Sequence, residues 1–123
     1  MVSRTLNKSE RLKKNKQITE LFEKGSSFYL FPFKVFTLPT EEREEPSHKF
    51  MVSIPKRLFK RAVDRNLLKR RIREAFRINK NLLGDGTFYH IAYIYTCKEI
   101  LTYREIETKL IKTLERLISQ TGA

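Results

Sequence analysis

The chain has 123 residues, a formal net charge of +12 and a sequence pI near 10.0. This length fits one domain with a modest core, and 40% apolar residues argue against a disordered chain. The charge narrows the partners to nucleic acid, anionic membrane or acidic protein. No apolar run approaches the ~18–20 residues that cross a bilayer, and the lone Cys97 allows no internal disulfide. We therefore expect a cytoplasmic protein with no membrane-spanning segment.

The first third of the chain predicts a basic tail, a helix and a strand. Residues 1–14 are rich in Lys and Arg and form the tail. Asn15 can cap a short helix that runs to about Lys24, where Gly25 stands in the stop position. The aromatic segment 28–38 is typical of a strand, and Pro32 places part of it at an edge or bulge.

The middle of the chain predicts a hairpin loop, a strand and a long helix. The loop covers residues 40–47, contains four glutamates and has Pro46 next to its end. Residues 48–54 read as the second strand, and Pro55 stops it. The helix follows over about 60–81 and is strongly basic.

The last third predicts a turn, a third strand and a final helix. Gly and Asp at 84–86 form the turn, and 88–96 is nearly all aromatic or β-branched, which fits a strand covered on both faces. Thr102 and Glu105 form a capping box that opens the final helix. The order α-β-β-α-β-α predicts the α+β class, with helices packed on a sheet as a single-domain α-β sandwich.

Most of the charge lies in residues 56–80, which hold eleven Lys or Arg and two acids. At 100° per residue, Arg65, Asn66, Lys69, Arg70, Arg73 and Arg77 occupy one arc of about 140°. The apolar residues Leu68, Ile72, Ala75 and Phe76 occupy the arc directly beside it. Asp64 and Glu74 fall outside the basic arc, so we expect them not to neutralise it. A uniformly basic, arginine-rich face favours a nucleic-acid partner over a merely solvated helix surface.

Three other functions remain open from the residues alone. A ribosomal protein would share this size and charge. A self-sufficient nuclease would need clustered carboxylates or a histidine pair, and His48 and His90 lie on different predicted strands with no motif around them. Membrane-surface binding through the tail would need large apolar residues for insertion, which the tail lacks, so we expect no membrane partner. We find no catalytic residue, no metal or cofactor site and no glycine loop for a small-molecule phosphate substrate.

Residues 62–76, AVDRNLLKRRIREAF, resemble the signature of the bacterial ribonuclease P protein subunit. Its R-N-x-x-K-R-x-x-R core is met by Arg65, Asn66, Lys69, Arg70 and Arg73. The similarity continues in order through R-L-K-K-N at 11–15, L-F-x-x-G at 21–25, S-x-x-K-R at 53–57 and Leu-Thr-Tyr at 101–103. Many members have a second arginine directly after Arg-Asn, where this chain has Leu67.

The resemblance implies a fold in which the basic helix lies in a left-handed βαβ crossover. It implies binding of a large catalytic RNA that removes the 5′ leader of precursor tRNA and performs the hydrolysis with Mg²⁺. The basic helix would contact the catalytic RNA, and a cleft between the first helix and the sheet would hold the leader. The residues so implied for the catalytic RNA are Lys56, Arg57, Arg61, Arg65, Asn66, Lys69, Arg70, Arg73 and Arg77.

For the leader, the resemblance implies Ile18, Phe22 and Phe36. Ile18 stands where an aromatic is often found. Independently, single-stranded RNA is held by aromatic faces beside a basic track. The segment 28–38 offers more aromatic side chains than one strand face can bury. Together with the resemblance, this leads us to expect that at least one of Phe22 and Phe36 faces solvent.

Overall fold

The computed structural model describes residues 15–40, 48–83 and 88–120. The predicted tail at 1–14, the turn at 84–86 and all of the acidic loop except its first residue lie outside these ranges. The described elements, in chain order, are α1 (Asn15–Lys24), β1 (Ser26–Leu30), β2 (Phe33–Thr40), β3 (Lys49–Ser53), α2 (Ala62–Asn79), the 3₁₀ helix η2 (Lys80–Leu83), β4 (Phe88–Tyr95) and α3 (Tyr103–Gln120). The α+β class is confirmed.

The aromatic segment 28–38 forms two strands, where one was predicted. β1 and β2 pair antiparallel with Leu30 opposite Phe33, so the chain turns at Phe31 and Pro32. The backbone N–H of Thr96 donates to the Pro32 carbonyl at 2.9 Å, which fastens this turn to the end of β4. Because large apolar residues continue through the turn, the residue pattern does not change there, and periodicity alone does not predict the turn. The order is therefore α-β-β-β-α-β-α, and Pro32 lies in a hairpin turn.

The sheet has the strand order β1-β2-β4-β3. β4 pairs antiparallel with β2 and parallel with β3, so α2 forms the connection of a parallel β3-α2-β4 unit. The left hand of this crossover stays an expectation from the resemblance, against the usual rule. The central place of β4 agrees with its predicted burial, since Ala92 and Tyr93 on opposite faces are both buried.

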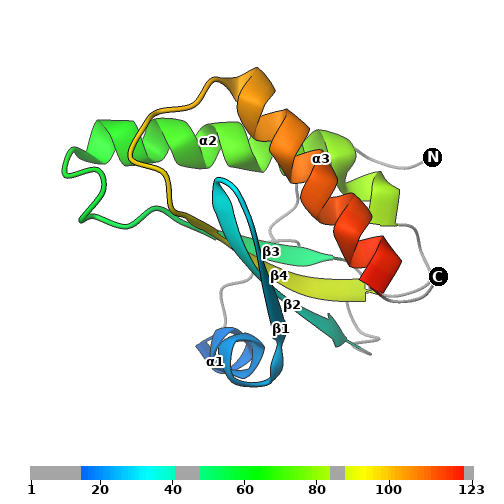
Figure 1. The fold of residues 1–123 in the computed structure, drawn as a ribbon. Helices are drawn as coiled ribbons and strands as arrows, with labels where there is room; N and C mark the ends of the chain where they lie inside the picture. Colours follow the sequence, from blue (N-terminus) through cyan, green and yellow to red (C-terminus); the bar gives the residue numbers. More distant parts are fainter. Residues whose placement is uncertain (1–14, 41–47, 84–87, 121–123) are drawn as a thin grey trace.

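The helices cover the two faces of the sheet unequally. α2 and α3 lie on one face and α1 lies on the other (Figure 1). Successive side chains of β2 point to opposite faces of the sheet. Val35 therefore joins the large core with α2 and α3, while Phe36 packs beside Leu21 of α1. Within α2, the apolar residues chosen from helical spacing are all fully buried, namely Leu68, Ile72, Ala75 and Phe76.

The start of α3 also agrees with the prediction from the sequence. The Thr102 hydroxyl accepts a hydrogen bond from the backbone N–H of Glu105 at 3.2 Å, as an N-cap residue should. None of the helices in the described ranges combines the length and apolar character that crossing a membrane requires.

Candidate nucleic-acid interface

The residues predicted to bind a large RNA line the outer side of α2 and the loop before it. We call these nine residues the basic face. Because the apolar stripe of α2 is turned into the core, its cations are directed away from the sheet. The exposed members are Lys56, Arg57, Arg61, Asn66, Arg70 and Arg73, and the half-buried members are Arg65, Lys69 and Arg77.

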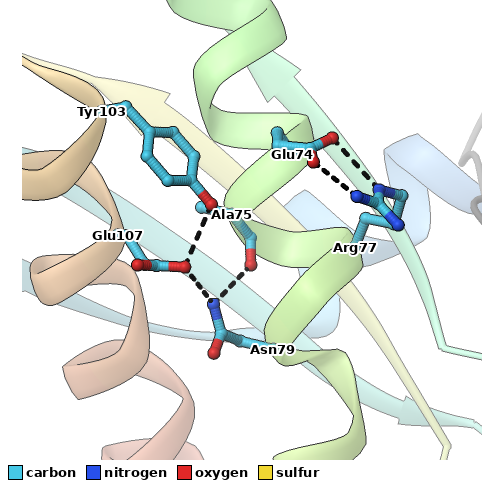
Figure 2. A network of polar contacts seen from close by, with 6 residues as sticks. All are labelled: Glu74, Ala75, Arg77, Asn79, Tyr103 and Glu107. Atoms are coloured by element: carbon cyan, nitrogen blue, oxygen red, sulfur yellow. Dashed lines mark hydrogen bonds and ion pairs between the residues drawn. The ribbon is translucent and has the colours of Figure 1, made fainter. Parts of the chain in front are cut away.

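One end of the basic face is partly neutralised, contrary to the expectation for Glu74. The Nε of Arg77 donates to Glu74 Oε2 at 3.1 Å, and its NH2 group forms a second bond to Oε1 (Figure 2). This bonding lowers the pKa of the Glu74 carboxyl and raises the pKa of the Arg77 guanidinium. The helical angles give only the direction in which each side chain leaves the backbone, so they did not predict this pair. The long arginine side chain reaches back along the helix to the residue three positions earlier.

The other end of the basic face begins in a loop that is tied to the helix. Arg65 NH1 donates to the carbonyl oxygens of Phe59 and Lys60 at 2.8 and 2.9 Å. The Phe59 ring is buried, with its centroid 5.9 Å from that of Tyr95. Sequence spacing placed Arg65 on the basic face but gave no sign of these backbone partners.

A network of hydrogen bonds joins α2 to α3 near the C-terminal end of α2. Asn79 Nδ2 donates to the Ala75 carbonyl at 2.8 Å and to Glu107 Oε2 at 3.1 Å, and the Tyr103 hydroxyl donates to the same Glu107 oxygen at 3.0 Å (Figure 2). Burial, with a smaller contribution from the bond to Glu107, raises the pKa of the Tyr103 hydroxyl to about 12. Sequence reasoning missed this network, because Asn79 and Glu107 lie 28 residues apart and belong to no motif.

A second link fixes α2 at its middle. Arg71 NH1 donates to the carbonyl oxygen of Leu101, just before α3. Arg71 was not assigned to the basic face, and this bond gives it a structural role. The direction of the basic face is therefore fixed by polar contacts to α3 as well as by the core.

The three residues predicted for a single strand of RNA come together on the opposite face of the sheet. The rings of Phe22 in α1 and Phe36 in β2 meet edge to face, with centroids 4.8 Å apart. Phe22 is 37% exposed and Phe36 is half-buried. Ile18 packs, like Phe36, against the buried side chains of Leu21 and Ala92. The expectation that at least one of the two rings faces solvent is confirmed.

Sequence reasoning missed one cation beside this pair. Lys34 is exposed, and its Nζ lies 5.4 Å from the centre of the Phe36 ring. Lys34 and Phe36 are two apart on β2 and so share a strand face, which could have drawn attention to Lys34. We call Ile18, Phe22, Lys34 and Phe36 the aromatic surface. It offers partly exposed aromatic carbon and one positive charge, as stacking on a nucleic-acid strand requires.

Comparison with known proteins agrees with this description. Residues 6–118 match the model of the Ribonuclease P family. A ribonuclease P protein component of Porphyromonas gingivalis is 37% identical over 118 residues, with 91% of this chain and 85% of that protein covered. One from Bacillus cereus is 32% identical over 111 residues, covering 90% and 93%.

Solved structures of similar proteins share the fold. The ribonuclease P protein of Thermotoga maritima superposes with a TM-score of 0.73 at 26% identity, covering 87% of this chain and 96% of that one. That of Staphylococcus aureus gives a TM-score of 0.71 at 28% identity, covering 88% and 94%. The family model spans nearly the whole chain, and the relatives are covered over most of their length. The chain therefore belongs to the ribonuclease P protein family.

Proposed function

We propose that this chain is the RNA-binding protein subunit of ribonuclease P and acts in the cytoplasm. In this role it binds the catalytic RNA and helps it remove the 5′ leader from precursor tRNA. The observation that carries the proposal is the basic face, whose cations stand outward because the apolar side of α2 is buried in the core. Arginine-rich faces of this kind bind phosphates, and arginine can also stack on bases.

In this proposal, each of two surfaces binds a different RNA. The basic face binds the catalytic RNA, and the aromatic surface holds the leader of the substrate. α2, which carries most of the basic face, and α1, which borders the aromatic surface, lie on opposite faces of the sheet, and this leaves room for two RNA segments at once (Figure 1). Phe22 and Phe36 offer ring area for stacking, and Lys34 supplies a charge for a neighbouring phosphate.

The hydrolysis itself is assigned to the RNA, as the resemblance implies. Within the stretches of chain that the structure describes, no three histidine, cysteine, aspartate or glutamate side chains gather as metal ligands would. We propose that the RNA holds the Mg²⁺ of the holoenzyme and that the protein contributes binding and orientation.

Replacement of Phe36 by Ala should weaken binding of precursor tRNA to the holoenzyme by roughly 5- to 150-fold, the value of one lost base stack. Mature tRNA has no leader, so its affinity should not change. Binding of the catalytic RNA and the single-turnover rate at saturating substrate should also stay the same. Equilibrium binding of the three RNAs and one single-turnover assay measure these quantities.

Phe31→Ala is the matched control for this experiment. Phe31 is also an exposed aromatic, 47% accessible, but it lies in the β1-β2 turn outside the aromatic surface. It should leave the ratio of precursor to mature affinity unchanged. Melting curves must show both variants folded, since Phe36 also packs on Phe22. Equal losses for precursor and mature tRNA in folded Phe36→Ala would show that the aromatic surface does not bind leader.

Neutralising Glu74 should tighten binding of the catalytic RNA. In Glu74→Gln, the carboxylate that now holds Arg77 is gone, and that guanidinium can turn to a phosphate. We expect the slope of log affinity against log salt to become steeper by about one phosphate contact. Glu115→Gln removes the same charge from an exposed position of α3 and serves as the control. An equal gain from both variants would point to net charge alone.

A further inference from the structure

The segment 55–61 links β3 to α2 and displays a dense group of charges. We call it the basic loop. Its four cations, Lys56, Arg57, Lys60 and Arg61, are all exposed. Like charges at such short spacing repel one another, and an unrestrained loop would spread them over many arrangements. A loop that is ordered before RNA arrives would bind more tightly, because less conformational freedom is lost on binding.

The basic loop has two internal ties. The backbone N–H groups of Leu58 and Phe59 donate to the Pro55 carbonyl at 3.1 and 3.3 Å, which closes a tight turn. The side chain of Phe59 is buried at 7% exposure and anchors the turn in the core. These ties hold the first part of the loop and leave the approach to α2 to be fixed by something else.

Arg65 supplies that missing restraint. Its NH1 group donates one hydrogen bond to the Phe59 carbonyl and another to the Lys60 carbonyl, at 2.8 and 2.9 Å. An NH1 group carries two hydrogens, so both are used. Arg61 is the N-cap residue of α2 and makes no capping bond with its side chain. The restraint at this helix start therefore comes from a residue in the first turns of α2 that reaches back to the loop.

We propose that Arg65 is a positioning residue that holds the basic loop in shape for RNA, and that its NH1 group is committed to the loop and does not ligate phosphate. This inference rests on the proposed function, in which Lys56, Arg57 and Arg61 contact the catalytic RNA. It separates Arg65 from Arg70, which is exposed and for which the described part of the chain shows no bond of this kind.

The first test uses the free protein and needs no RNA. Backbone hydrogen exchange of the Asp64 amide, which donates to the Arg61 carbonyl at 3.2 Å where the basic loop meets α2, is measured by NMR in Arg65→Gln and in the matched control Arg70→Gln. We expect exchange at this amide to become at least about tenfold faster in Arg65→Gln and to stay unchanged in Arg70→Gln. Unchanged exchange in folded Arg65→Gln overturns the proposal.

The second test is a double-mutant cycle for binding of the catalytic RNA. Arg65→Gln is made in the wild-type chain and in a chain carrying Lys56→Gln and Arg57→Gln. We expect a loss of about tenfold in the first background and at most about twofold in the second, because a loop without its cations has little left to position. Arg70→Gln should cost the same in both backgrounds.

An equal loss from Arg65→Gln in both backgrounds would mean that Arg65 contacts RNA independently, which overturns the proposal. The two experiments also separate this inference from the proposed function. If the wild-type protein fails to bind the catalytic RNA, the proposed function fails and so does the role of the loop in RNA binding. The exchange measurement still decides whether Arg65 orders the loop.

Discussion

Raising monovalent salt from about 50 to 200 mM should weaken binding of the catalytic RNA by roughly 250- to 4,000-fold. The reason is release of counterions from the phosphates that the basic face neutralises. With about five to seven such contacts, log affinity should fall with log salt at a slope of roughly −4 to −6. Equilibrium titrations of labelled RNA at four or five salt concentrations give the slope directly.

The same titrations should be repeated with Arg70→Gln and Arg73→Gln. Each loss of one phosphate contact should make the slope shallower by about one. Both positions are exposed, so the folded state should be little affected. A wild-type slope shallower than about −2, or a slope that neither variant changes, would mean that RNA binds somewhere other than the basic face.

Ile72→Ala should lower the free energy of unfolding by about 2–5 kcal/mol, which can be most of the stability of a domain of this size. Ile72 is fully buried in the α2 stripe beside the ring of Phe76, which stacks on Phe50 with centroids 4.1 Å apart. Truncation leaves a cavity in this packed layer, and the surroundings relax only in part. Urea unfolding followed by circular dichroism measures the change.

Arg70→Ala is the matched control, because it lies two residues earlier in α2 on the exposed side. Its effect on unfolding should stay within about 0.5 kcal/mol, as at most surface positions. RNA affinity should show the reverse order. Arg70→Ala should bind the catalytic RNA more weakly, and the folded fraction of Ile72→Ala should bind it with nearly normal affinity. Similar destabilisation by both variants would contradict the assignment of the two sides of α2.

The helical parts of the fold could be predicted from residue spacing. The 3.6-residue period identifies which side of α2 enters the core, and the structure buries the predicted stripe from Leu68 to Phe76. The same reasoning gives the capped start of α3 at Thr102. It works because each of these features depends on residues within one or two turns of the same helix.

Features that depend on distant partners could not be predicted in this way. The turn at Pro32 lies within a continuous aromatic run, and its hydrogen bond to Thr96 joins residues that are 64 positions apart in the chain. The partners of Arg65 are the loop carbonyls of Phe59 and Lys60, whose position follows from the anchoring of Phe59 in the core. The meeting of Phe22 with Phe36 requires that α1 pack back over β2, which the spacing of these residues does not contain.

The central claim is that this protein assists an RNA that carries the chemistry. The most direct measurement is cleavage of precursor tRNA by purified protein alone, catalytic RNA alone and both together, at one Mg²⁺ concentration and subsaturating substrate. We expect no cleavage by nuclease-treated protein alone, and a rate with both components well above that of the RNA alone. Cleavage at the leader junction by RNA-free protein, or no gain when the protein joins the RNA, would contradict the account.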